Sequence, residues 1–404
     1  MKTIEEGLAI VMSVAKGKDR PDRMAAESVP LSESPCRILR EDVFADADSP
    51  PFDKAIRDGF AVRFEDLTQT PATLSVIAES RAGFAAAVTV QRGQCCEIMT
   101  GAPLPAGANA VVMVENTERP SPASVRILKS VRENEGLLRR AAEARKGDRV
   151  LHAGCRIGLA DIGLLAGSGK SSVMVSRKPR VAILATGDEL VEVQQDPGPS
   201  QIRNSNSYTI HRQVVEAGAE PVLLGIGKDN LEDLRTKIRH GLEHDILLVS
   251  GGVSMGKYDL VENVLAESGV EVLFDKIAMK PGKPTVFGHL GQVYVFGLPG
   301  NPVSTIVSFH MFVRPLILFL LKAEDTKPKV LEAKLDAPAK CDPQRTSLVP
   351  ANVRFEDGRY RIAPAPWKGS SDLVGLARAN ALIVIPRREG TLEAGETAQF
   401  LPME

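Results

Sequence analysis

Three glycine-rich turns lie close together within residues 245–304, and each is next to an apolar run with the length and composition of a buried strand. Residues 250–256 follow the run DILLV, residues 279–284 precede TVF, and residues 297–302 follow VYVF. In open α/β sheets, ligands bind at the loops after the carboxyl ends of parallel strands. One such turn alone is also typical of a tight corner, but three together predict a shared rim that binds a ligand.

The residue types in these turns favour an anionic ligand. Glycine lets backbone N–H groups approach an anion closely, and the start of a helix adds a positive dipole at the same place. Lys280 and Lys283, each followed by a proline, add two cations on a stiff loop. The sequence therefore predicts an oxyanion or phosphate site on this rim.

Acidic residues follow three successive predicted strands of the same region. Glu189 comes after the first strand, Asp229 after the second and Asp259 after the third. Each alone is also explained as a helix cap, Asp229 in particular. As a group, carboxylates gathered at one edge of a sheet predict a divalent cation that bridges phosphate or oxyanion oxygens.

The 404-residue chain is too long for one core, and its patterns change along its length. Strands that alternate with helical segments predict a doubly wound α/β domain, whereas short alternating runs between Gly and Pro turns predict β domains. The predicted fold class is multidomain α/β plus β, with an elongated helical and β N-terminal part. The predicted domains are a discontinuous helical linker domain (1–45 with 147–177), an inserted β domain (46–146), the α/β domain (178–325) and a small C-terminal β-barrel (326–404).

Charge and cysteine usage narrow the partners and the compartment. The net charge of −1 provides no general attraction to nucleic acid or to a membrane surface. Five scattered cysteines without metal-ligand spacing predict a reducing compartment. The N-terminus carries acids early, unlike a secretory signal, and the apolar stretch 309–321 is interrupted by Arg314 and Pro315 and is too short to span a bilayer. We therefore expect a cytoplasmic protein.

The motifs SGGVSMGKYD, KPGKP and GLPGNPVS resemble the molybdopterin-binding domain of the molybdopterin molybdenumtransferases, the enzymes that insert molybdenum during cofactor biosynthesis. Further stretches similar to this family occur in the expected order at residues 58–61, 98–103 and 186–190. The resemblance covers essentially the whole chain, and the ordered series is far more specific than any single motif.

The resemblance implies a reaction and its reactants. The substrates would be molybdate and adenylylated molybdopterin, a pterin dithiolene joined to AMP through a pyrophosphate, with Mg²⁺ as cofactor. Molybdenum would enter the dithiolene and AMP would be released. The family also implies a homodimer in which Asp58 and Thr100 reach the cleft of the second subunit, and transient contact with the molybdopterin-adenylylating enzyme or with client molybdoenzymes.

The resemblance also assigns roles to residues at matching positions. It implies that Asp58, Glu189, Asp259, Lys280 and Lys283 are catalytic, with Glu189 and Asp259 at the metal. Molybdate is expected at Lys280 and Lys283 together with two residues of the C-terminal domain, Arg345 and Ser370. The implied substrate-binding set is drawn from all the matching motifs: Thr100, Gly187, Asp229, Ser250, Gly251, Gly252, Ser254, Pro299, Gly300, Asn301, Pro302, Arg345, Ser370 and Ser371.

Two departures from the family pattern keep a second hypothesis open. Residues 55–57 are Ala-Ile-Arg where bacterial members have Ser-Ala-Met, and Glu143 replaces an Asp and lacks its flanking glycine. These changes favour a carrier that holds molybdopterin or finished cofactor without inserting metal. A third hypothesis is a scaffold whose α/β domain binds a protein partner, but no feature of the sequence favours it. Asn206 matches a family asparagine, with helix capping as the alternative, and Trp367 is expected to anchor a loop rather than stack on a ligand.

Overall fold

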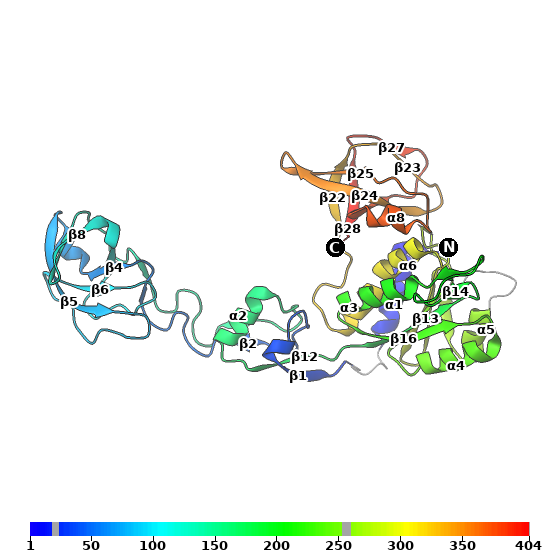
Figure 1. The fold of residues 1–404 in the computed structure, drawn as a ribbon, viewed down its shortest axis with the longest axis horizontal. Helices are drawn as coiled ribbons and strands as arrows, with labels where there is room; N and C mark the ends of the chain where they lie inside the picture. Colours follow the sequence, from blue (N-terminus) through cyan, green and yellow to red (C-terminus); the bar gives the residue numbers. More distant parts are fainter. Residues whose placement is uncertain (18–23, 253–259, 404) are drawn as a thin grey trace.

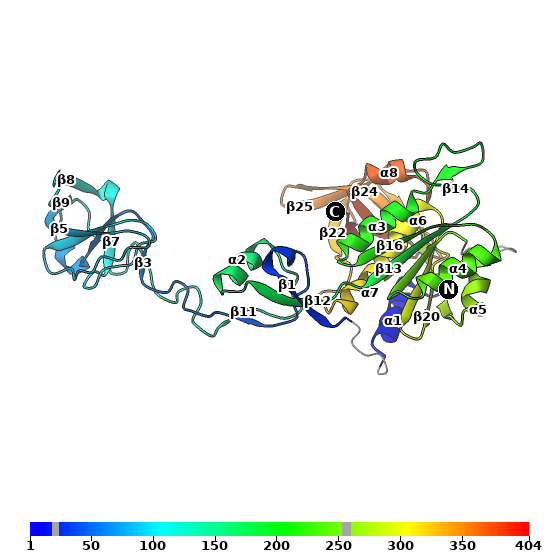
Figure 2. The ribbon, with the colours of Figure 1, turned by 60° about the horizontal axis from the view of Figure 1, so that its bottom comes forward.

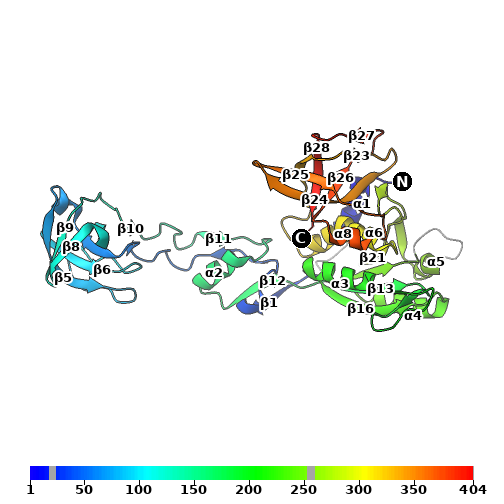
Figure 3. The ribbon, with the colours of Figure 1, turned by 45° about the horizontal axis from the view of Figure 1, so that its top comes forward.

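The computed structural model describes residues 1–17, 24–252 and 260–403. The molecule is elongated (Figure 1), with a β domain at one end, a small unit of two-stranded ribbons in the middle, and an α/β sheet with a barrel at the other end. Figures 2 and 3 show the same separation from two other directions. Both chain termini lie at the end that holds the α/β sheet and the barrel.

The distal β domain contains one six-stranded sheet with the order β7-β4-β6-β5-β9-β8. Neighbouring strands are antiparallel except for the parallel pair β5–β6. The core holds Phe60, Val62, Leu74 and Val125. The strands are β4 (Gly59–Val62), β5 (Ala72–Ser80), β6 (Gln94–Ile98), β7 (Ala110–Met113), β8 (Thr117–Ser121) and β9 (Ser124–Ile127).

The middle unit is made of two antiparallel ribbons and one helix. The first ribbon joins β1 (Ala26–Pro30) to β12 (Ser172–Ser176), and the second joins β2 (Val43–Phe44) to β11 (Arg149–Leu151). Helix α2 (Leu159–Gly167) packs beside them. The chain therefore leaves for the distal β domain after β2 and returns in β11.

Two chain segments, residues 45–53 and 139–148, form a neck between the middle unit and the distal domain. Arg139 pairs with Asp53, and Arg140 Nε donates to Asp48 at 2.5 Å. The Ser49 hydroxyl donates to Glu143 at 2.7 Å. Glu143, one of the two family departures, is thus engaged in a contact between the two neck segments.

Helix α1 (Ile4–Ala15) begins at a capping box, in which the Glu6 N–H donates to the Thr3 hydroxyl at 3.2 Å and the Thr3 N–H donates to the Glu6 carboxylate at 2.8 Å. Its residues Ile4 and Val11 lie in the same core as Phe312 of the α/β domain. The sequence grouped this helix with the linker domain, but the helix packs at the far end of the molecule from the distal domain.

The α/β sheet has the strand order β16-β13-β17-β21-β20-β18. The first four strands are parallel, β20 pairs antiparallel with β21, and β18 pairs antiparallel with β20 at the edge. The strands are β13 (Arg180–Thr186), β16 (Glu220–Gly227), β17 (Ile246–Ser250), β18 (Glu271–Phe274), β20 (Val286–Leu290) and β21 (Val293–Leu298).

Helices cover both faces of this sheet, so the predicted doubly wound architecture is confirmed. On one face, α3 (Asn206–Glu216) and the helical segment after β21 pack against Ile183. On the other face, α4 (Leu231–Gly241) and α5 (Leu260–Glu267) pack against Leu184. Neighbouring residues of β13 thus point into opposite cores, as the two-residue period of a strand requires.

One continuous helical segment follows the turn 297–302 and is built from α6 (Pro302–Ser308), the π-helical turn η4 (Phe309–Val313) and α7 (Arg314–Leu320). By length and composition alone this segment is long and apolar enough to cross a membrane, although the apolar stretch itself was expected to be too short. Within the protein, 72% of its most apolar window is buried. That burial is what the core helix of a soluble protein shows.

The C-terminal region is a closed five-stranded barrel, as predicted, because β24 pairs with both β25 and β26 and completes the circuit β24-β25-β22-β28-β26. Its core includes Ile362, Ile383 and Phe400. Strand β19 (Met279–Lys280) of the α/β domain joins β24 in parallel. The barrel strands are β22 (Leu331–Leu335), β24 (Thr346–Glu356), β25 (Arg359–Pro364), β26 (Ala381–Ile385) and β28 (Thr397–Pro402).

Candidate active site

A cleft of about 950 Å³ opens where the α/β sheet meets the barrel. The carboxyl ends of the parallel strands β13, β17 and β21 reach it, because Thr186, Ser250 and the turn after Leu298 line its wall. All three glycine-rich turns contribute to this one cleft. The barrel supplies the facing wall through Arg345 and residues 369–371.

Most of the predicted site residues that the structure describes line this cleft. They are Gly187, Glu189, Asp229, Ser250, Gly251, Gly252, Lys280, Lys283, Pro299, Gly300, Asn301, Pro302, Arg345, Ser370 and Ser371. Asp58 and Thr100 instead lie in the distal β domain. Ser254 and Asp259 lie outside the described residues.

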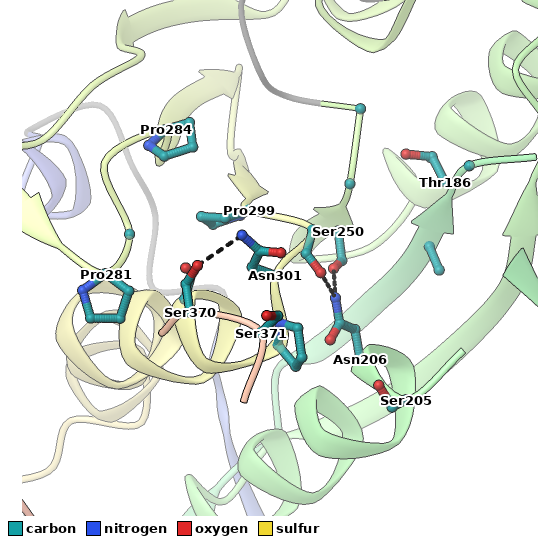
Figure 4. A pocket seen from close by; sticks show the side chains of 18 of the residues that line it. Thr186, Ser205, Asn206, Ser250, Pro281, Pro284, Pro299, Asn301, Ser370 and Ser371 are labelled. Atoms are coloured by element: carbon teal, nitrogen blue, oxygen red, sulfur yellow. Dashed lines mark hydrogen bonds between the residues drawn. The ribbon is translucent and has the colours of Figure 1, made fainter. Parts of the chain in front are cut away.

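Asn206 connects two of the glycine-rich turns (Figure 4). Its Nδ2 donates to the hydroxyl of Ser250 at 2.9 Å and to the carbonyl of Gly300 at 2.8 Å. The predicted alternative of helix capping does not apply, since Asn206 is the first helical residue of α3 and Ser205 precedes it as the cap residue. The amide group therefore fixes the spacing of the two turns.

Backbone crowding requires glycine at the turn after β17. Gly251 has φ +93°, and a Cβ there would lie 2.5 Å from the carbonyl oxygen of Thr186. Gly252 has φ +61°, and its Cβ would lie 2.8 Å from the Thr186 hydroxyl. That hydroxyl is buried and has no hydrogen-bond partner within residues 1–17, 24–252 and 260–403. Thr186 thus brings to the cleft wall a hydroxyl group whose hydrogen-bonding capacity is unused among the described residues.

Cations gather on the side of the cleft nearest the barrel. Arg345 Nη2 donates to the carboxylate of Asp342 at 2.9 Å, and Lys280 Nζ lies 3.9 Å from the same Oδ2 atom. The backbone N–H of Gln344 and the guanidinium of Arg345 outweigh the effect of burial and hold the pKa of Asp342 below its ordinary value. Asp342 is therefore charged at neutral pH and balances part of the positive charge.

Hydrogen bonds join the barrel to the turn 297–302. Asn301 Nδ2 donates to the Ser370 hydroxyl at 2.9 Å (Figure 4), and the Val303 N–H donates to the Ser370 carbonyl at 3.0 Å. Side chain and backbone of one barrel residue thus hold the start of α6. The two walls of the cleft are fixed to each other at this point.

Acidic side chains lie on the opposite side of the cleft. Gly187 has φ +141°, and a Cβ at this position would lie 2.3 Å from a carboxylate oxygen of Glu189. Asp229 lines the cleft and is not the cap of α4, because the Asn230 side chain accepts from the Asp233 N–H. Within the described ranges, no cluster of three or more His, Cys, Asp or Glu side chains forms a ready-made metal site. Among the described residues, Glu189 and Asp229 are the carboxylates that line the cleft.

Asp58 forms a compact acid–hydroxyl pair in the distal domain. Its Oδ1 atom accepts from the Thr100 N–H at 2.6 Å and from the Thr100 hydroxyl at 2.8 Å. These two bonds, the backbone one first, lower the pKa of Asp58 below its ordinary value. Asp58 directly precedes β4, which lies at the opposite end of the molecule from β13, whose Thr186 lines the cleft (Figure 1).

Family models match three consecutive parts of the chain. Residues 2–169 match the "MoeA N-terminal region (domain I and II)", residues 182–318 the "Probable molybdopterin binding domain", and residues 332–403 the "MoeA C-terminal region (domain IV)". A molybdopterin molybdenumtransferase of Nostoc sp. is 35% identical over 100% of this chain and 94% of its own length. The enzyme of the same name from Bacillus subtilis is 36% identical over 93% of this chain and 89% of its own length.

The chain belongs to the molybdopterin molybdenumtransferase family. A crystal structure of a molybdopterin biosynthesis MoeA protein from Pyrococcus horikoshii has a TM-score of 0.81 and 28% identity, and covers 100% of both chains. A second structure of a protein so named from this organism has a TM-score of 0.77 and 31% identity, with 100% and 99% covered. The domain order of the chain is therefore that of its family.

Several residues that line the cleft were not predicted from the sequence. Thr186 and Arg203 line it, and Trp367 lines it while also packing against the main core. Asp342 was missed because it lies behind the cationic side chains. The Asp-Pro pair at 342–343 is an ordinary turn signal, so only its contacts reveal a link to the cleft.

Proposed function

We propose that this chain inserts molybdenum from molybdate into adenylylated molybdopterin and releases AMP. The observation that carries the proposal is the single cleft that all three glycine-rich turns line together with Lys280, Lys283, Arg345 and Glu189. The substrate is a polyanion, and molybdate is a tetrahedral oxyanion. Such reactants need backbone donors for phosphate, cations for the oxyanion and a carboxylate for a metal.

We assign molybdate to the cationic side of the cleft. Lys280 and Lys283 lie on one loop, while Arg345 and Ser370 come from the barrel, so an oxyanion between them would contact both walls. The planar Arg345 guanidinium presents paired donors to an oxyanion, whereas the lysines act as point charges. The turns at Gly251, Gly252 and residues 299–302 are left to hold the pyrophosphate.

We assign Mg²⁺ to the acidic side of the cleft. Glu189 and Asp259 would hold it, and the unpaired oxygen of Thr186 is a neutral donor of the type that hard cations accept. Mg²⁺, when bound, neutralises charge on phosphate oxygens and favours departure of the AMP group. The protein's own part is to orient the pyrophosphate on the glycine turns and to hold the Glu189 carboxylate beside it.

We further propose a homodimer in which the distal domain of one subunit completes the cleft of the other. The distal domain that carries Asp58 and Thr100 and the α/β sheet that carries the cleft lie at opposite ends of one elongated chain (Figure 1), so Asp58 can act at a cleft only in a second copy. The twofold symmetry of a dimer would bring each pair to the partner's cleft. Contact with an adenylylating enzyme or a client molybdoenzyme would then be transient.

The carrier hypothesis is not favoured. Glu143 contacts Ser49 in the neck and lies away from the cleft, and the cleft keeps Glu189 and both lysines. We place the protein in the cytoplasm, since all five cysteines are free thiols.

AMP release from adenylylated molybdopterin tests the function, with molybdate and Mg²⁺ each present or omitted. Release that requires both, and a product that activates an apo-molybdoenzyme, is the expected result. Glu189→Gln should abolish release and retain pterin binding, whereas Glu192→Gln, which changes a carboxylate outside the cleft lining, should not affect either. Tight pterin binding by the wild-type protein without AMP release would contradict the proposal and favour the carrier.

A further inference from the structure

One carboxylate behind the cleft is shared by two cations that line it. Asp342 is not among the described residues that form the cleft wall, whereas Arg345 and Lys280 are. The Asp342 side chain is 15% exposed, and that of Lys280 is 53% exposed. The Asp342 carboxylate therefore lies behind the cleft wall and contacts the wall residues Arg345 and Lys280 from there.

We propose that Asp342 is a positioning residue that aims Arg345 and Lys280 at the oxyanion substrate. This inference rests on the proposed function and adds to it the residue that sets the geometry of the molybdate site.

The two carboxylate oxygens have separate tasks. Oδ1 accepts from the backbone N–H groups of Gln344 at 2.9 Å and Arg345 at 3.1 Å, and so fixes the turn that carries the arginine. Oδ2 accepts from Arg345 Nη2 at 2.9 Å and faces Lys280 Nζ at 3.9 Å. A guanidinium has five N–H donors, so a bond to Asp342 orients the fork and leaves other donors for a ligand.

The backbone brings the two cations together, and Asp342 then directs their side chains. Strand β19 pairs in parallel with β24, which places Met279 opposite Thr346 and Lys280 opposite Ser347. Arg345 immediately precedes Thr346, so Arg345 and Lys280 both lie at the short β19–β24 pairing. Without the Asp342 carboxylate, the positive charges of Lys280 and Arg345 would repel each other, and their side chains would occupy many rotamers.

Charge alone would give Asp342 the opposite effect. A carboxylate close to an anion site weakens anion binding by repulsion. Its removal should tighten molybdate binding if it acts only as a counter-charge, and should weaken binding if it positions the cations. The sign of the change therefore separates the two roles.

Asp336 is a matched control on the same barrel. It pairs with two cations, Arg354 at 2.6 Å and Arg361 at 2.7 Å, and is 16% exposed, but its partners do not line the cleft in the part of the chain that is described. Asp336→Asn and Asp342→Asn thus remove the same charge from similar ion networks. Only the second network faces the substrate.

The experiment measures molybdate binding by calorimetry and the KM and kcat of AMP release in both variants. Asp342→Asn is expected to raise the molybdate Kd and KM about tenfold, the effect of one misdirected bond to a charged group, with kcat within about twofold of wild type. Asp336→Asn is expected to leave all three unchanged. In an Arg345→Met background, the effect of Asp342→Asn should be smaller than in the wild type, because only the contact with Lys280 remains.

If Asp342→Asn does not fold, Asp342→Ser keeps a hydroxyl acceptor for the turn and carries the same expectation. Molybdate binding by either Asp342 variant that equals or exceeds wild type would overturn the positioning role and leave the proposed function intact. A wild-type protein that binds no molybdate would overturn both proposals.

Discussion

The carboxylate of Asp58 accepts hydrogen bonds from both the backbone N–H and the hydroxyl of Thr100, at 2.6 Å and 2.8 Å. This pair lies in the distal domain, while Lys280 lies in the cleft at the other end of the chain. If the two act together, they come from different subunits. This relationship makes the proposed dimer testable by mixing variants.

We expect Asp58→Asn and Lys280→Met to be inactive alone and to regain activity when co-expressed. A mixed dimer would contain one cleft with both changes and one with neither, so random pairing should restore about a quarter of wild-type AMP release. The control is a mixture of Glu189→Gln and Lys280→Met, which change the same cleft and should not complement. Absence of recovery in the first mixture would argue against shared clefts.

The pKa of Asp58 should respond to loss of the Thr100 hydroxyl. Because hydrogen bonds to the ionised form lower this pKa, Thr100→Val should raise it, while the remaining backbone bond keeps it below the ordinary value. Stability from this pair is present above the unfolded-state pKa and is lost as pH falls through the folded-state pKa. Carboxyl NMR titration measures the shift, with Thr73→Val at an exposed position of β5 as the control. An unchanged pKa in Thr100→Val would contradict the assignment.

Gly187→Ala should disturb the metal side of the cleft. The new methyl group would lie 2.3 Å from a carboxylate oxygen of Glu189 and would displace that side chain. The backbone φ of +141° at this position also favours glycine. We expect the Mg²⁺ concentration for half-maximal AMP release to rise about tenfold. Gly163→Ala is the control, since its methyl group meets nothing within 4 Å. Equal Mg²⁺ dependence of AMP release in both variants would show that Glu189 does not bind the metal.

Asn206→Asp should destabilise the α/β domain. The substitution replaces the amide donor that serves Ser250 and Gly300 with a carboxylate that faces the Gly300 carbonyl. We expect the free energy of unfolding in urea to fall by about 1–3 kcal/mol. Asn352→Asp, an exposed position on β24, introduces the same charge and should have little effect. A similar loss in both variants would point to net charge rather than to the lost bonds.

Thiol reactivity should follow burial. Burial raises the pKa of Cys95 to about 12 and that of Cys96 to about 11, whereas Cys36 is exposed. At about pH 8, iodoacetamide should modify Cys36 first and leave Cys95 and Cys96 intact until the distal domain unfolds. Peptide mass spectrometry with and without urea measures this order. Modification of Cys95 as fast as Cys36 would show that the distal sheet opens in the native state.

The sequence predicted the parts of the structure that depend on local pattern. Buried runs such as residues 181–185 identified the parallel sheet, and glycine turns after strand ends identified the cleft. Long-range packing was less accessible. An amphipathic α1 does not specify which core its Val11 joins, and Asp342 becomes informative only once β19 pairs with β24 and brings Lys280 beside Arg345.

The distal domain enters and leaves the rest of the chain through hydrogen-bonded neighbours, β2 and β11. An element whose two ends are adjacent can be inserted into a host or removed from it without breaking the host's own core. Removal of the distal domain would therefore leave the cores of the α/β sheet, the barrel and the middle unit intact.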